Sequence, residues 1–171
     1  MTLTPATEAD IRSVSLQLGR EARDIVAIAA RCVCGNPIVV QTSPRLGDGT
    51  PFPTMYYLTL PAATAALSRL EAEGVMVTLQ DKLAADADFA KAYQAAHEQY
   101  LADRALLGDV PEIEGISAGG MPTRVKCLHA LAGHALAAGP GVNLVGDAAL
   151  ELCSWKQNVC QCKPAIDVDV V

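Results

Sequence analysis

Residues 124–136 read Arg124-Val-Lys-Cys127-Leu-His129-Ala-Leu-Ala-Gly-His134-Ala-Leu. The apolar spacing of this stretch predicts a helix that carries one thiol and two imidazoles. A pair of thiols, Cys32-Val-Cys34, lies far upstream in the chain. Thiolates and imidazoles are the ligands that zinc prefers, and here they come from two separated segments. The two stretches together therefore predict a metal site that fastens the fold.

The chain has 171 residues, a length that suits one domain, and 51% of them are hydrophobic, which is enough for a full core. No apolar run approaches the ~18 residues that span a bilayer. The N-terminus shows neither a basic region nor an apolar stretch, so we expect no signal peptide and a cytoplasmic protein. We expect one α+β domain over residues 1–155 and an irregular C-terminal tail over residues 156–171.

The charge and the cysteine content exclude some classes of function. The formal net charge of -6 argues against general nucleic-acid binding, which needs lysine and arginine to neutralise phosphates. Six cysteines in a chain without an export signal indicate metal binding or thiol chemistry rather than disulfides. Nothing in the composition indicates an oligomeric state.

The first third of the chain predicts a small sheet. Three short segments are rich in β-branched or aromatic residues and have glycine or proline nearby: residues 24–31, 38–42 and 55–59. The gap between the first two is short enough for a hairpin, and an antiparallel meander is the simplest topology. An amphipathic helix capped by Thr7 precedes the sheet and ends at Leu18.

From Pro61 onward the hydrophobic period becomes helical. We expect the fold class α+β, with a three-stranded antiparallel sheet packed against four or five helices. Pro122 or Thr123 should open the helix that carries Cys127, because proline suits a first helical turn. The helices expected from residue 61 onward span residues 62–73, 75–85, 86–107, 122–139 and 146–155.

Helical geometry selects the ligands within the late stretch. At ~100° per residue, Cys127 and His134 lie on nearly one face, while His129 points elsewhere. The predicted metal ligands are therefore Cys32, Cys34, Cys127 and His134. If the helix begins later, Cys127 lies in the entry turn and His129 becomes reachable instead. Buried core thiols or a redox pair would also explain these cysteines.

The tail repeats the Cys-x-Cys spacing at Cys160 and Cys162. The two pairs together could host an iron–sulfur cluster or a thiol relay, whereas the tail alone could bind metal adventitiously. Zinc or another thiolate-preferring metal is the expected cofactor, with an iron–sulfur cluster as the alternative. Cys153 is most simply a core thiol.

Two further groups of residues suggest chemistry. His97 shares a helical stripe with Tyr93, Tyr100 and Arg104, and His97 and His129 are the candidate proton carriers. The stripe is also typical of a half-buried helix face. A glycine-rich turn before a helix can bind a small anion through its backbone amides, although every helix start needs a turn. The residues expected to bind such an anion are Gly119, Gly120, Arg124 and Lys126.

Several unusual strings in one order resemble an uncharacterised bacterial family, the domain of unknown function 501. They are Gln17-Leu-Gly-Arg20, Arg31-Cys32 with Gly35-Asn-Pro37, Asp48-Gly-Thr-Pro-Phe-Pro-Thr54 with Tyr57-Leu-Thr59, Leu70-Glu71 with Gly74, His97 with Tyr100 and Arg104, and Val125-Lys-Cys-Leu-His-Ala130. The resemblance covers roughly residues 15–150 and implies no activity. It implies that Cys32 and the Cys-Leu-His triplet recur, and that family genes neighbour those for a septum-formation initiator.

We therefore expect an uncharacterised protein with a zinc-type site joining the N-terminal hairpin to a late helix. One alternative is an enzyme that acts on a small phosphorylated or carboxylated substrate, with His97 or His129 moving a proton. The other alternative is a non-enzymatic partner in cell-envelope or division processes.

Overall fold

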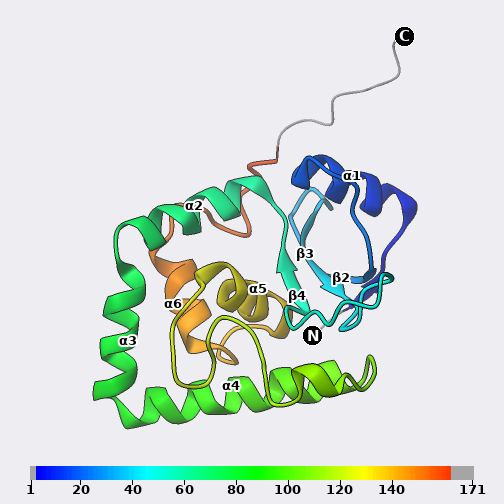
Figure 1. Ribbon diagram of the computed structural model, residues 1–171. Helices are drawn as coiled ribbons and strands as arrows, with labels where there is room; N and C mark the ends of the chain where they lie inside the picture. Colours follow the sequence, from blue (N-terminus) through cyan, green and yellow to red (C-terminus); the bar gives the residue numbers. More distant parts are fainter. Residues whose placement is uncertain (1–2, 163–171) are drawn as a thin grey trace.

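The computed structural model describes residues 3–162 and confirms the α+β class (Figure 1). Its sheet is an antiparallel meander with the strand order β1-β2-β3-β4. The three predicted strands are present, and β1 adds a fourth that is too short to show an alternating pattern. The strands span Thr4–Pro5 (β1), Ile25–Arg31 (β2), Pro37–Thr42 (β3) and Tyr56–Leu58 (β4).

The part of the chain that the structure describes contains six α-helices and one short 3-10 helix. Within residues 3–162, no helix combines the length and the apolar character that crossing a bilayer requires. The helices span Glu8–Leu18 (α1), Pro61–Ala72 (α2), Val75–Ala85 (α3), Ala87–Ala105 (α4), Pro111–Ile113 (η1), Leu128–Ala138 (α5) and Leu144–Leu152 (α6).

The helix with the late cysteine begins several residues after the predicted start at Pro122 or Thr123. The backbone amide of Arg124 donates to the Gly120 carbonyl at 2.9 Å, and that of Lys126 donates to the Gly119 carbonyl at 2.8 Å. These bonds fold residues 119–126 into a turn rather than a helix. Cys127 is consequently the N-cap residue of α5, in extended backbone conformation.

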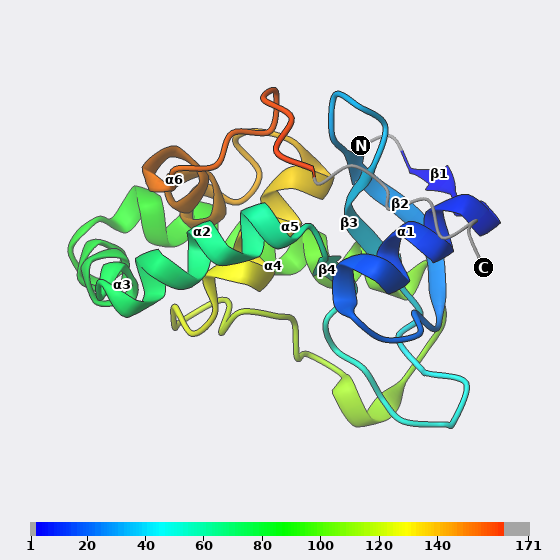
Figure 2. The same ribbon diagram turned by 90° about the horizontal axis from the view of Figure 1, so that it is seen from above.

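Helices cover both faces of the sheet, as Figures 1 and 2 show. On one face, Val14 of α1 packs against Ile28 and Val40 of the two central strands. On the other face, α5 lies against the sheet and is in turn covered by α2 and α6. Residues of β2 and β3 therefore contribute to two apolar clusters, one with each helical layer.

Two glycines allow α5 to lie close to its neighbours. A Cβ atom on Gly133 would lie 3.0 Å from the Tyr56 carbonyl oxygen of β4. A Cβ atom on Gly146 of α6 would collide with the Leu131 carbonyl oxygen of α5. The sheet, α5 and α6 can therefore stack at this separation only because both positions lack a side chain.

A partly buried ion pair ties the N-terminal segment to the sheet. The Arg31 guanidinium donates to both carboxylate oxygens of Asp10, at 2.6 and 3.0 Å, and the Asp10 side chain is only 9% exposed. The same guanidinium donates to Thr4 Oγ1 and to the Gly35 carbonyl. The hydrogen bonds between Arg31 and Asp10 hold the pKa of Asp10 far below its ordinary value. One side chain thus links β1, α1, β2 and the turn after β2.

Asp10→Asn should lower the free energy of unfolding at pH 7 by about 1–3 kcal/mol, because it removes a charged hydrogen-bond acceptor from a mostly buried pair. The lowered folded pKa makes this contribution complete above the ordinary value of 3.8, and it is lost as the pH falls below that value. Urea unfolding at several pH values should show the difference between the two proteins shrinking in acid.

Glu8→Gln is the matched control, because Glu8 is an acid of the same first turn that lies 3.8 Å from Arg12 with both side chains exposed. An exposed pair contributes little to stability. Equal losses of stability in the two variants would contradict the role assigned to Asp10.

Candidate metal centre

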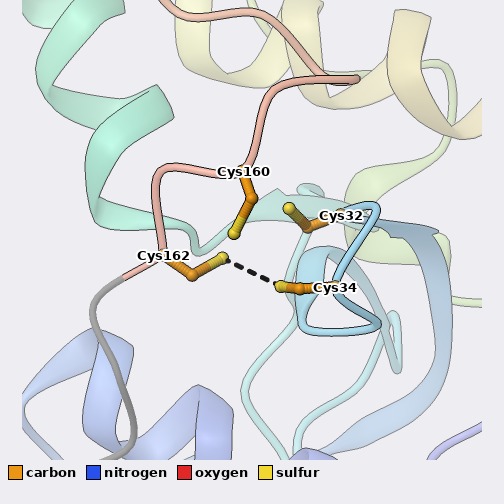
Figure 3. A group of neighbouring side chains, drawn as sticks. All are labelled: Cys32, Cys34, Cys160 and Cys162. Atoms are coloured by element: carbon orange, nitrogen blue, oxygen red, sulfur yellow. Dashed lines mark hydrogen bonds between the residues drawn. The ribbon is translucent and has the colours of Figure 1, made fainter.

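Four cysteines from two segments far apart in the sequence lie side by side (Figure 3). Cys32 and Cys34 come from the turn between β2 and β3, and Cys160 and Cys162 come from the segment after α6. All four sulfur atoms lie within 4.8 Å of one another, and those of Cys34 and Cys162 are 3.5 Å apart. None of the four is in a disulfide.

The hairpin turn presents its two thiols because its backbone closes tightly. The Cys32 amide donates to the Asn36 carbonyl at 2.9 Å, and the Gly35 amide donates to the Cys32 carbonyl at 2.8 Å. Gly35 has φ of 92°, a left-handed conformation that costs glycine little. Cys32 is buried and Cys34 is exposed. Both side chains lie between the turn and the C-terminal segment (Figure 3).

The C-terminal segment is guided to the hairpin by anchors just after α6. Trp155 is buried in the core at 2% exposure. The Lys156 ammonium donates to the Leu150 and Glu151 carbonyls at 3.2 and 2.8 Å, where the helix leaves carbonyl groups without intrahelical partners. Residues 156–162 form no helix or strand, and the rest of the tail expected over residues 156–171 lies outside the described residues, so the tail stays a prediction.

The four thiols have different surroundings. The backbone N–H of Asn36 lowers the pKa of Cys34 to about 7, whereas burial raises the pKa of Cys32 and of Cys162. Four thiolates this close repel one another unless a cation lies between them. A tetrahedral zinc centre with Zn–S bonds of about 2.3 Å separates its sulfurs by about 3.8 Å, which lies within the spacing observed here.

The structure groups the predicted ligands differently from the sequence analysis. Cys32 and Cys34 adjoin Cys160 and Cys162, and among the described residues neither Cys127 nor His134 belongs to that cluster. For Cys160 and Cys162 the sequence predicts an iron–sulfur cluster or a thiol relay with the first pair, or adventitious binding by the tail alone. The repeated Cys-x-Cys spacing was the indication in the sequence that the two pairs belong together.

His134 is enclosed in the core rather than in a metal site. Its ring is fully buried, stacks on the Tyr56 ring at 5.8 Å and meets the edge of Tyr100 at 5.1 Å. The Asn143 amide nitrogen lies 3.1 Å from Nδ1, and because an amide nitrogen only donates, Nδ1 accepts. Burial lowers the pKa of His134 to about 4, so the ring is neutral at pH 7.

Cys127 belongs to a second group, formed with Glu71 of α2 and His129 of α5, whose three ligand atoms lie within 4.8 Å of one another. His129 Nδ1 is 3.1 Å from Glu71 Oε1, and the Leu128 amide donates to the same oxygen at 2.7 Å. A hydrogen bond with His129 lowers the pKa of Cys127. The same hydrogen bond is the largest cause that raises the pKa of His129 to about 9. The late start of α5 thus makes His129, rather than His134, the imidazole that is near Cys127.

The other candidate residues are placed as follows. His97 is buried, its Nδ1 lies 2.8 Å from Ser117 Oγ, and burial lowers its pKa. Arg124 and Lys126 are exposed, and their amides donate to the Gly120 and Gly119 carbonyls of the same turn. A catalytic role for His97 or His129, and anion binding by this turn, stay predictions.

Comparison with known proteins gives one match. A family model described as "Protein of unknown function (DUF501)" matches residues 28–151. No curated protein and no solved structure matches. The matched range includes Cys32, Cys34 and the group around Cys127, and it ends before Cys160 and Cys162.

The buried His134 should make the protein sensitive to mild acid. Its imidazole takes up a proton near pH 6.5 when unfolded but only near pH 4 when folded, so protons favour the unfolded chain between these values. Stability should therefore fall by on the order of 2–3 kcal/mol as the pH drops from 6.5 to 4. His134→Phe should remove this component, as urea unfolding across that range can measure.

The effect of His134 is the difference between the free energies of unfolding of the two proteins at each pH, because His97 and His129 are present in both. Any loss of stability at pH 7 from the substitution itself shifts the profile without changing its slope. Parallel profiles for the wild type and His134→Phe would show that His134 does not titrate as described.

Proposed function

The chain belongs to the DUF501 family, whose description assigns no activity, and we propose its function from the four-cysteine cluster. The protein binds a thiolate-preferring metal ion that fastens its C-terminal segment to the β2–β3 hairpin. Zinc is the leading candidate for this ion. The single observation that carries this proposal is the convergence of the four sulfur atoms within 4.8 Å.

A metal ion would supply what the C-terminal segment lacks. Up to residue 162 the segment forms no helix or strand after α6, and Cys34 and Cys162 are 128 residues apart in the chain. Closing so long a loop costs conformational entropy, and the binding energy of a structural metal offsets that cost. The same energy would hold the segment against the hairpin.

The proposed role is structural, because four thiolates complete the tetrahedral shell of zinc and leave no position for a substrate. An iron–sulfur cluster could use the same four ligands, and iron content together with visible absorption distinguishes it from zinc. The proposal also requires a reducing compartment such as the cytoplasm, because the adjacent thiols would otherwise be oxidised to disulfides.

Two other functions remain predictions. Catalysis on a phosphorylated or carboxylated molecule would join Arg124 and Lys126 to His97, but the two basic residues are exposed whereas His97 is buried against Ser117. A partner role in cell-envelope or division processes rests on the family resemblance alone. The four-cysteine cluster is thus the best supported basis for a function.

Protein purified without a tag and under reducing conditions should contain bound zinc, measured by elemental analysis. The double variant Cys160→Ser/Cys162→Ser should lose about one equivalent of metal relative to the wild type, because serine does not replace a thiolate ligand. Its melting temperature should fall, and limited proteolysis should cut the segment after α6 more rapidly.

Cys153→Ala is the control, because Cys153 is a free thiol outside the cluster whose removal should leave the metal content unchanged. Equal metal content in the double variant and the wild type would overturn the proposal. So would wild-type protein from reducing cytoplasm whose intact mass shows the four cysteines already paired as disulfides.

A further inference from the structure

The group around Cys127 has the features of a metal site of its own. The thiol comes from the N-cap of α5, the imidazole from the first turn of that helix, and the carboxylate from the last turn of α2. Cys127, His129 and Glu71 contribute one sulfur, one nitrogen and one oxygen, all within 4.8 Å of one another. These donor types are the three that zinc takes in proteins.

The hydrogen bonds of His129 orient Nδ1, rather than Nε2, toward Glu71. Nε2 lies 3.1 Å from the Thr64 carbonyl oxygen, which only accepts, so Nε2 carries the hydrogen. In the neutral ring, Nδ1 therefore has a lone pair, and it faces Glu71 Oε1 at 3.1 Å. An imidazole that donates its other N–H to a backbone carbonyl is the usual support for a metal-binding histidine.

The carboxylate is supported in a similar way. Glu71 Oε1 accepts the Leu128 amide at 2.7 Å, which fixes the carboxylate against the start of α5. Two anionic ligands and one neutral imidazole would balance the charge of a divalent cation. Without a cation, the thiol and the carboxylate compete for the single proton that His129 Nδ1 can carry.

We propose that Glu71, Cys127 and His129 form a second, open metal site that binds Zn²⁺ with three protein ligands. The fourth position of the tetrahedron holds water or a small anionic ligand, as in zinc sites that keep one position open. The exposed fractions of the Glu71 and His129 side chains, 25% and 26%, give such a ligand access from solvent. The four-cysteine cluster, by contrast, supplies a complete set of ligands.

The two sites are independent, because they share no residue and come from different elements. Failure of one proposal therefore leaves the other standing. The competing use of the same residues is a metal-free reactive thiol, in which His129 and Glu71 hold Cys127 as a thiolate. Metal binding predicts that Zn²⁺ slows the alkylation of Cys127, whereas a free reactive thiol predicts no effect of Zn²⁺.

The test uses the full chain with Cys160→Ser/Cys162→Ser, so that the four-cysteine cluster no longer binds metal. Co²⁺ should bind with about one equivalent and give the near-ultraviolet charge-transfer band of a cobalt–thiolate bond. Azide should shift the visible bands by occupying the open position. Adding Glu71→Gln, Cys127→Ser or His129→Gln should weaken Co²⁺ binding at least about 100-fold, since each removes a direct ligand.

Glu73→Gln is the matched control, because Glu73 is an exposed acid at the end of the same helix and should leave binding unchanged. Glu71→Gln retains an oxygen that can accept the Leu128 amide, so its metal-free melting temperature should be close to that of the parent. Co²⁺ binding that survives in Glu71→Gln and His129→Gln would overturn the proposal. Cys127 that iodoacetamide alkylates equally fast with and without Zn²⁺ would overturn it in favour of the free thiol.

Discussion

The close packing of α5 between the sheet and α6 is the constraint on which the rest of the structure depends. Gly133 and Gly146 permit this packing, because a side chain at either position would meet the backbone of the neighbouring element. The position of α5 between these layers buries His134 beside two tyrosine rings. It also brings the first turn of α5 against the end of α2. Both the enclosed core histidine and the open group around Cys127 therefore follow from the position of one helix.

Much of the fold could be predicted from local sequence. The three main strands and α1 follow from periodicity and from the capping residue Thr7, and the structure adds a reciprocal hydrogen bond between Thr7 and Asp10. The start of α5 could not be predicted in this way. Glu71, 57 residues before Leu128, accepts the first helical amide, and the Gly119 and Gly120 carbonyls hold the preceding turn. No local pattern indicates which distant acceptor an amide will find.

The candidate ligands show the same limit. Spacing along a regular helix favoured His134 over His129 as the partner of Cys127, and the later helix start reverses that preference. Cys160 and Cys162 lie in a segment without periodicity, so their position beside Cys32 depends on anchors such as Trp155 rather than on any pattern near them. The two clusters differ in kind: one groups four thiols, and the other groups a thiol, an imidazole and a carboxylate that are partly exposed to solvent.

The bonds of Arg31 carry a consequence for the cooperativity of the fold. Its guanidinium holds Asp10 of α1 and also the carbonyl of Gly35, in the turn that presents Cys32 and Cys34. With a metal ion bound to the four sulfurs, the N-terminal helix, the hairpin and the segment after α6 would form one continuous set of contacts. Local opening of α1 would then be shared by residues 156–162, and we expect these two segments to unfold as a single unit.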